Sequence, residues 1–171
     1  MVYFDPRGMG ESSPIVEDSD MGMAAVRADF QALRQHLGLE SVNAIGWSNG
    51  AMNLILLAAE NPETIDSAVF LHGAAYFSEE DSAAYAARYP EVFEAWGALV
   101  QELENPELTE DQRTEKMRAM WLDEWFPISF ADRASASEIL EVTFGNAEFS
   151  WAHGSYSPRA QAGFDARSML P

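Results

Sequence analysis

The sequence feature that most constrains the fold is a Gly-x-Ser-x-Gly pentapeptide set between two different patterns. Residues 42–45 form a short β-prone apolar run, the pentapeptide occupies residues 46–50, and residues 51–59 are apolar on nearly every side. A strand, such a pentapeptide and then a helix are typical of a nucleophile elbow, a tight turn that holds its central residue exposed. A helix that is apolar all round is a buried one. The pattern therefore predicts an elbow above a buried helix; the alternative is a glycine-bounded loop with an ordinary serine.

The elbow gives each residue of the pentapeptide a role. Gly46 and Gly50 should permit the turn, because a Cβ at either position would collide with the crossing backbone. Ser48 should project its hydroxyl from the end of a sheet, directly after Trp47. The backbone N–H of Asn49 should face a developing oxyanion. The sequence thus predicts a candidate nucleophile beside one oxyanion donor.

Strand-type and helix-type patterns alternate through the first half of the chain. Residues 2–4, 42–45 and 68–72 are β-prone, whereas residues 23–37 carry apolar side chains at steps of three and four. Such spacing predicts a helix with one apolar face, which Gly38 is well placed to end. Strands that alternate with helices at this spacing favour βαβ units, hence an α/β fold with a parallel sheet.

Residues 5–14 are dense in turn-forming residues. Asp5 and Arg7 lie at the start of this loop, where we expect them to pin its backbone rather than to act in catalysis. Gly8 and Gly10 do not form a phosphate cradle. The third glycine of a dinucleotide fingerprint is missing, and no helix opens directly after them.

Four blocks of the first half carry a family resemblance. They are the loop Phe-Asp-Pro-Arg-Gly-Met-Gly-Glu-Ser at 4–12, the helix end at 33–39, the pentapeptide at 46–50, and Asn-Pro-Glu at 61–63 leading to Val-Phe-Leu at 69–71. Together they resemble the α/β-hydrolase fold, most closely its proline iminopeptidase-type branch, over about residues 1–75. The resemblance implies that Ser48 is the nucleophile of a serine hydrolase and that the Asn49 N–H is an oxyanion donor. It implies acyl transfer on a small peptide, amide or ester, with a proline iminopeptidase-like aminopeptidase favoured, and no cofactor.

The chain departs from the family pattern at both ends. Family members have strands ahead of the Asp-x-Arg-Gly loop, and the third of these lies between the fourth strand and the nucleophile strand. Their catalytic acid and histidine follow the cap on later strands, whereas this sequence stops at residue 171. We therefore expect a fragment, with a core segment at 1–75, a helical cap at 76–168, and the start of a return to the core at 169–171. The expected fold is a partial α/β-hydrolase sheet with a helical cap domain.

The second half of the sequence predicts helices and no strand. The helical patterns cover residues 83–88, 91–103, 110–125, 137–144 and 158–167. Such an insertion is where the family places its cap, which shapes the substrate pocket and excludes water. Trp121, Asp123, Glu124 and Trp125 form the most pocket-like segment. Peptidases of the branch that the chain resembles hold the free amino group of the substrate with cap carboxylates, so the resemblance implies this role for Asp123 or Glu124. The alternative is that the tryptophans pack inside the cap and the acids are solvated.

A serine nucleophile needs an imidazole as its base and a third group to orient that imidazole. The chain has three histidines, His36, His72 and His153. His36 lies off the apolar stripe of its helix, His72 ends a β-prone run next to the nucleophile strand, and His153 follows no strand. None of them completes a convincing triad. No metal-ligand spacing such as His-Glu-x-x-His occurs, so we expect no metal site.

Composition limits the class of partner. The 171 residues carry 28 acidic and 10 basic side chains, a net charge of -18, which argues against nucleic acid and anionic membranes as partners. The chain has no cysteine, which excludes disulfides and thiolate chemistry. It begins without a basic leader and contains no long apolar segment, so we expect a cytoplasmic protein.

Three functional hypotheses remain from the sequence. The first is a serine hydrolase of a small-molecule or short-peptide substrate. The second is a non-catalytic truncated chain, or a half that depends on a partner for its missing strands, histidine and acid; exposed strand edges would then favour self-association. The third is a ligand-binding module that uses the cap pocket without chemistry.

Overall fold

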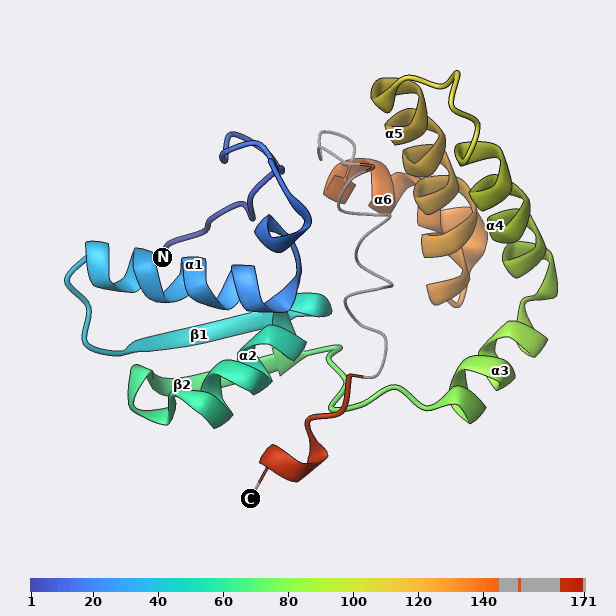
Figure 1. Cartoon of the computed structure of the whole chain (residues 1–171). Coiled ribbons are helices and arrows are strands. Elements are labelled where there is room, and N and C mark those ends of the chain that lie inside the picture. Colours follow the sequence, from blue (N-terminus) through green and yellow to red (C-terminus); the bar gives the residue numbers. More distant parts are fainter. Residues whose placement is uncertain (145–150, 152–163, 171) are drawn as a thin grey trace. The chain divides into compact units, whose positions relative to one another are not determined.

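The computed structural model describes residues 1–144, 151 and 164–170 (Figure 1). The described residues divide into two compact units. The first unit contains Met1–Arg7, Ser12–Ser78 and residues 164–170, and the second contains Gly8–Glu11, residues 79–144 and residue 151. Each unit is described by itself below.

The centre of the first unit is a pair of parallel strands joined by a helix. β1 (Val42–Trp47) leads through Ser48 into α2 (Asn49–Glu60), and a 3-10 turn at Pro62–Thr64 leads into β2 (Ile65–Leu71). β2 pairs with β1 in parallel, with Ala44 opposite Ala68 and Trp47 opposite Leu71. The predicted α/β class and parallel pairing are therefore confirmed.

Helix α2 packs against both strands. It buries four apolar side chains, those of Ala51, Met52, Leu54 and Leu57. This is the buried helix that its apolar sequence predicts, because a helix without a polar face is stable only when covered.

Helix α1 (Gly22–His36) lies beside β1 and contacts α2 (Figure 1). Arg27 forms an ion pair with Glu60 at 3.1 Å, and Gln31 donates a hydrogen bond to Thr64 at 3.3 Å. Gly38 follows the helix end with a φ of 68°, a backbone conformation that glycine adopts without steric cost. The predicted helix and its end are both confirmed.

The predicted strand at residues 2–4 is wrong for this structure. These residues form no regular element, and the side chain of Tyr3 is 83% exposed. A β-prone run becomes a strand only when a neighbouring strand receives its backbone hydrogen bonds. Within the described residues no strand lies next to residues 2–4 to do so.

Between residues 79 and 144 the second unit is helical throughout its regular structure. It contains α3 (Glu79–Arg88), α4 (Pro90–Leu103), α5 (Glu110–Ala119), a π-helical turn at Met120–Trp125, 3-10 turns at Phe126–Ser129 and Arg133–Ser135, and α6 (Ala136–Phe144). Thr109 and Gln112 cap the start of α5 reciprocally, which satisfies two backbone N–H groups. The helices predicted up to residue 144 are confirmed, although the one predicted at 110–125 changes to wider turns from residue 120.

The predicted helix at 158–167 falls mostly outside the described residues. Its described residues 164–166 are not helical: Asp165 forms an antiparallel bridge with Tyr76, and the N–H of Ala166 donates to the Ala75 carbonyl at 2.7 Å. A 3-10 turn at Arg167–Met169 follows. Residues 164–166 therefore join the first unit at the segment that leaves β2.

Candidate active site

The turn between β1 and α2 holds Ser48 in an unusual backbone conformation. Ser48 has a φ of 52° and a ψ of -117°, and it is one of two non-glycine residues with positive φ in the described part of the chain. Its N–H donates to the carbonyl of Leu71 in β2 at 2.8 Å. Its own carbonyl accepts from the N–H of Ala51 at 3.0 Å, which starts the helix. A non-glycine residue in this region costs about 1–3 kcal/mol, so its surroundings impose the conformation.

The sharpness of the turn depends on Gly46. A Cβ added at Gly46 would lie 2.4 Å from the carbonyl oxygen of Gly50 and 2.7 Å from the Cα of Ala51. The start of α2 therefore crosses directly over β1, as expected for an elbow. The same expectation for Gly50 is wrong, because a Cβ there would have no atom within 4 Å. In this crossing the Gly50 carbonyl lies against Gly46, so of the two glycines only Gly46 must lack a Cβ.

Ser48 and Asn49 are exposed at the end of β1, and Trp47 beside them is 53% exposed. Asn49 is the first residue of α2, where a helical N–H has no intrahelical acceptor. Its side-chain oxygen accepts a hydrogen bond from the Asn53 amide at 2.9 Å. This bond ties the Asn49 side chain to the next turn of the helix. The Asn49 N–H thus lies at the exposed start of α2, directly after Ser48.

The end of β2 supports the elbow from the neighbouring strand. His72 has a φ of 53° and follows Leu71, whose carbonyl accepts the Ser48 N–H. A Cβ added at Gly73 would lie 2.5 Å from the Cβ of Ala51, so this turn packs closely on the first turn of α2. His72 therefore lies at the same edge of the sheet as Ser48. Sequence analysis placed His72 near the site, but its positive φ was not foreseeable from the sequence.

No imidazole of the described residues is hydrogen-bonded to the Ser48 hydroxyl. His72 is exposed, and His36 ends α1 with an exposed side chain. His153 lies outside the described residues. The arrangement therefore places an exposed serine beside the first N–H of α2, and no imidazole among the residues described is bonded to that serine.

The predicted substrate-binding segment lies in the second unit. Trp121 packs edge-on against Trp96 and Trp125, with ring centroids 5.6 Å apart in each pair. Trp125 also packs on Phe93 at 5.2 Å. Both tryptophans are half-buried in this aromatic cluster, which adjoins the buried side chains Val92, Met120 and Ile128.

The two acids of the same segment lie on the outside of the unit. Asp123 and Glu124 are exposed and belong to the π-helical turn that carries the tryptophans. This arrangement matches the alternative stated for this segment in the sequence analysis, in which the tryptophan rings pack inside the unit and the carboxylates are solvated. Their role in binding a substrate amino group stays a prediction.

The loop that starts at Asp5 is anchored by an arginine, as predicted. Arg7 donates to Asp29 in α1 at 2.7 and 3.0 Å and to Asp20 at 2.7 Å. The hydroxyl of Ser12 donates to the Asp5 carbonyl at 2.6 Å, so Asp5 takes part through its backbone. The sequence did not predict that Asp20 and Asp29 accept hydrogen bonds from Arg7. They lie 13 and 22 positions further along the chain, and no local sequence signal pairs residues that are so far apart.

These bonds shift the pKa values of their members. Hydrogen bonds to Asp29 and Asp20 raise the pKa of Arg7 above its ordinary value. The pKa of Asp20 is lowered, chiefly because its carboxylate accepts hydrogen bonds from the backbone N–H groups of Val16 and Glu17, and also from Arg7. Both shifts favour the charged forms that hold the loop on α1.

Within the described residues, no three side chains of His, Cys, Asp or Glu gather as a metal would require. None of the helices traced through residues 1–144 and 164–170 combines the length and the apolarity needed to cross a bilayer.

Comparison with known proteins agrees with this geometry. The mouse and human proteins named serine hydrolase BPHL are 35% and 34% identical to this chain over 86 residues, which is 50% of this chain and 30% of theirs. The chain thus spans less than a third of the length of these curated relatives.

Solved structures share the fold at low identity. An alpha/beta fold family hydrolase from Bacillus anthracis matches with a TM-score of 0.67 and 20% identity, over 96% of this chain and 58% of that one. An esterase from Exiguobacterium antarcticum matches with a TM-score of 0.60 and 19% identity, over 98% of this chain and 57% of that one. Residues 1–131 match the alpha/beta hydrolase fold family. With its strained serine at the strand-to-helix turn, this chain belongs to the alpha/beta hydrolase fold family.

Proposed function

We propose that Ser48 is the nucleophile of a serine hydrolase that transfers an acyl group from a small ester, amide or peptide. The observation that carries this proposal is the backbone of Ser48, held at a φ of 52° by a 2.8 Å hydrogen bond to Leu71. The strained residue is also exposed, so its hydroxyl is accessible to a substrate. Strain retained at an exposed serine beside a free helix N-terminus is characteristic of nucleophilic sites.

The chemistry follows from the positions of the atoms. The Ser48 hydroxyl oxygen attacks the substrate carbonyl while an imidazole accepts its proton, and the Asn49 N–H donates to the resulting oxyanion. The oxyanion collapses, the leaving group takes the proton, and an acyl-enzyme remains. Water then attacks the acyl carbonyl, and the serine regains its proton. The imidazole is supplied by His153 or by polypeptide outside the 171 residues, because no described imidazole contacts the serine.

Within this proposal the favoured substrate class is a short peptide or amide with a free amino group, as for a proline iminopeptidase-like aminopeptidase. Two features support it: the Asp-x-Arg-Gly-x-Gly-x-Ser loop at residues 5–12, and the exposed carboxylates Asp123 and Glu124 beside an aromatic cluster. A carboxylate offers an ammonium group a charge-assisted hydrogen bond. The esterase alternative draws support from the serine alone.

We further propose that the protein acts in the cytoplasm on a small molecule or short peptide, and not on nucleic acid or at a membrane. The net charge of -18 supports this, because phosphate backbones and anionic lipids would repel such a surface.

A fluorophosphonate probe tests the nucleophile directly. The probe should label the 171-residue chain, and Ser48→Ala should abolish labelling, whereas Ser19→Ala, at an exposed serine of the same unit, should retain it. Label that persists in Ser48→Ala would show that another residue reacts. If the chain is not labelled, a longer protein that includes the flanking polypeptide should be tested in the same way; absence of label there would overturn the proposal.

The substrate class is tested by comparing an aminoacyl arylamide with an acetyl ester of similar size. An aminopeptidase should prefer the arylamide, and Asp123→Asn with Glu124→Gln should raise its KM without changing the KM of the ester. An equal increase in KM for both substrates would show that these carboxylates do not bind the substrate amino group.

The second candidate, a half that depends on a partner, is favoured by a different observation. The outer edge of β1 is uncovered in the described residues, and Ile45 on that strand is 68% exposed.

A further inference from the structure

Asn53 is the polar member of the buried residues of α2. Its side chain is 6% exposed, and its neighbours Met52 and Leu54 are buried as well. The side-chain oxygen of Asn53 is buried and has no hydrogen-bond partner among the described residues. An amide buried in this way costs stability that an apolar side chain of similar size would not. Packing alone therefore does not account for an asparagine at this position.

The orientation of the Asn53 side chain is fixed by its contacts. Its Nδ2 lies 3.0 Å from the backbone carbonyl oxygen of Asn49. A carbonyl oxygen only accepts hydrogen bonds, so the nitrogen of the amide must face it. The same Nδ2 also donates to the side-chain oxygen of Asn49 at 2.9 Å. Side chains four residues apart meet on one face of a helix, so this bond holds the Asn49 oxygen toward the next turn of α2.

The start of α2 presents N–H groups for which the helix has no acceptor. The N–H groups of Ala51 and Met52 donate to the Ser48 carbonyl at 3.0 and 3.2 Å. The N–H groups of Asn49 and Gly50 precede them, where a helix offers no carbonyl. Both residues are exposed and directly follow Ser48. Their N–H groups are thus the donors that the proposed function requires for the oxyanion.

An asparagine at the first position of α2 has a local alternative that would block these donors. Asparagine side chains readily hydrogen-bond to their own or to a neighbouring backbone N–H group. An Asn49 oxygen that turned back in this way would occupy one donor and bring the negative end of its dipole beside the developing oxyanion. The bond from Asn53 prevents this turn, because it engages the same oxygen further along the helix.

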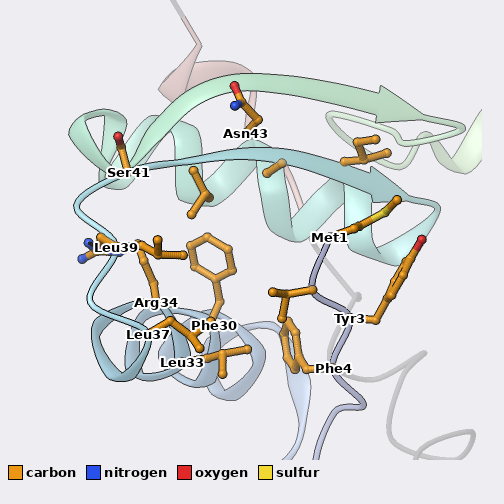
Figure 2. A pocket seen from close by; sticks show the side chains of 14 residues that line it. Met1, Tyr3, Phe4, Phe30, Leu33, Arg34, Leu37, Leu39, Ser41 and Asn43 are labelled. Carbon is orange, nitrogen blue, oxygen red and sulfur yellow. Dashed lines mark hydrogen bonds between the residues drawn. The ribbon is translucent and has the colours of Figure 1, made fainter.

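The apolar groove of the first unit does not explain the amide pair. This groove, of about 500 Å³, is lined chiefly by residues 1–4, by the α1 side chains Phe30, Leu33 and Leu37, and by residues 41–45 (Figure 2). Asn49 and Asn53 do not line it. The hydrogen bonds between them therefore do not prepare this groove for a ligand.

We propose that Asn53 is a positioning residue of the active site, whose Nδ2 holds the Asn49 side-chain oxygen away from the N–H groups that begin α2. This role rests on the proposed function, because those N–H groups need to stay open only if an oxyanion forms at Ser48. The buried, unpartnered oxygen of Asn53 then has an explanation. An amide brings its NH2 group, with two hydrogens to donate, only together with a carbonyl.

The kinetic test uses the fluorophosphonate probe, whose phosphoryl oxygen takes the place of the oxyanion, on the form of the protein that is labelled at Ser48. Asn53→Leu keeps the size of the side chain and removes the donor. It should lower the rate constant of labelling at least about tenfold, because loss of one oxyanion donor is costly. Asn49→Ala keeps the backbone N–H and removes the side-chain oxygen. Added to Asn53→Leu, it should restore the rate at least about fivefold.

A purely structural role of Asn53 predicts no such recovery. If Asn53→Leu lowered the rate by distorting α2, removal of a second side chain would not restore it, and that result would overturn the proposal. Asn53→Asp, which also lacks the NH2 group, replaces Asn53→Leu if circular dichroism shows that variant to be unfolded.

The matched control is Thr64→Val, which removes another buried side-chain hydrogen bond, from the Thr64 hydroxyl to the Asn61 carbonyl at 2.8 Å. Thr64 lies beyond the opposite end of α2, so the labelling rate should stay within about twofold of the unmodified protein. A tenfold loss in this control as well would overturn the assignment to Asn53.

Amide exchange tests the same contact without any reactivity at Ser48. In the 171-residue chain, exchange of the Asn49 or the Gly50 N–H with water, measured by NMR, should slow at least about fivefold in Asn53→Leu, when the released oxygen accepts from it. Unchanged exchange at both residues would overturn the proposal. A protein in which Ser48 is never labelled would overturn the hydrolase instead, while the exchange rates would still show whether Asn53 holds the Asn49 oxygen.

Discussion

Among the residues of the elbow, Gly46 and Gly50 differ in what surrounds their Cα atoms. A Cβ at Gly46 would meet backbone atoms of Gly50 and Ala51 at 2.4–2.7 Å, and backbone cannot move aside as a flexible side chain can. We expect Gly46→Ala to lower the free energy of unfolding by about 3 kcal/mol, the upper range for overpacking. Gly50→Ala should change it by less than about 0.5 kcal/mol. Urea denaturation of the two variants measures the difference, and equal losses would contradict the crossing geometry.

His72 occupies the second strained backbone position at the same edge of the sheet. With a φ of 53°, this residue sits where glycine and asparagine are tolerated and β-branched residues are not. His72→Asn should retain the thermal stability of the chain, whereas His72→Val should lose about 1–2 kcal/mol. Thermal melts followed by circular dichroism would show this. An equal loss in both variants would indicate that the imidazole, rather than the backbone conformation, stabilises the turn.

At the level of elements, the loop at the start of the chain is held on α1 by Arg7. Arg7→Met keeps much of the side-chain volume and removes the hydrogen bonds to Asp20 and Asp29. We expect faster amide hydrogen exchange over residues 5–7 and 12–18, with β1 and α2 unchanged. Arg27→Met removes a different ion pair of α1, with Glu60, and is the matched control. Unchanged exchange in Arg7→Met would show that the loop is held by other contacts.

The ion pair between Asp165 and Arg167, at 2.6 Å, gives a pH-dependent prediction. Hydrogen bonds from the Arg167 side chain and N–H lower the pKa of Asp165 from 3.8 to about 2. A carboxyl whose folded pKa is depressed adds stability above its unfolded pKa and loses that stability as pH falls through the folded value. The contribution should therefore be complete above about pH 4 and lost toward pH 2.

Carbon NMR of the Asp165 carboxyl would give the midpoint of this titration, and Asp165→Asn should remove the corresponding part of the acid dependence of stability. Arg167→Ala removes the side-chain hydrogen bonds to Asp165, so it should raise the midpoint toward the ordinary value. A midpoint near 3.8 in the unmodified chain would contradict the bond geometry.

For the whole molecule, the dominant long-range effect is the net charge of -18. Like charges repel in the compact state, and salt shortens the range of that repulsion from about 30 Å at 0.01 M to about 3 Å at 1 M. We expect the Tm to rise as sodium chloride is added from 0.01 M to 1 M, because repulsion between the excess acidic groups outweighs the attraction within ion pairs. Scanning calorimetry measures it; a falling Tm would mean that the ion pairs dominate.

Much of this fold could be predicted because its signals are local. The Gly-x-Ser-x-Gly turn, the apolar α2, the stripe of α1 with Gly38 at its end, and the helices of the second unit each depend on residues within a few positions of one another. Ser48 and Asn49 were found for that reason. The strand expected at residues 2–4 failed because it depends on a distant neighbour: these residues have the composition of a strand, but the described residues pair no strand with them.

The sequence by itself determined where the elbow lies and which residue stands at its centre, since a tight turn between a strand and a helix is encoded by the residues that form it. Only the tertiary structure decided that Gly46 and not Gly50 bears the steric requirement, because the clash depends on how α2 crosses β1. It also decided that the Ser48 N–H donates to the Leu71 carbonyl and that Arg7 donates to Asp20 and Asp29. These contacts join residues far apart in the chain, where no sequence pattern records which groups will meet.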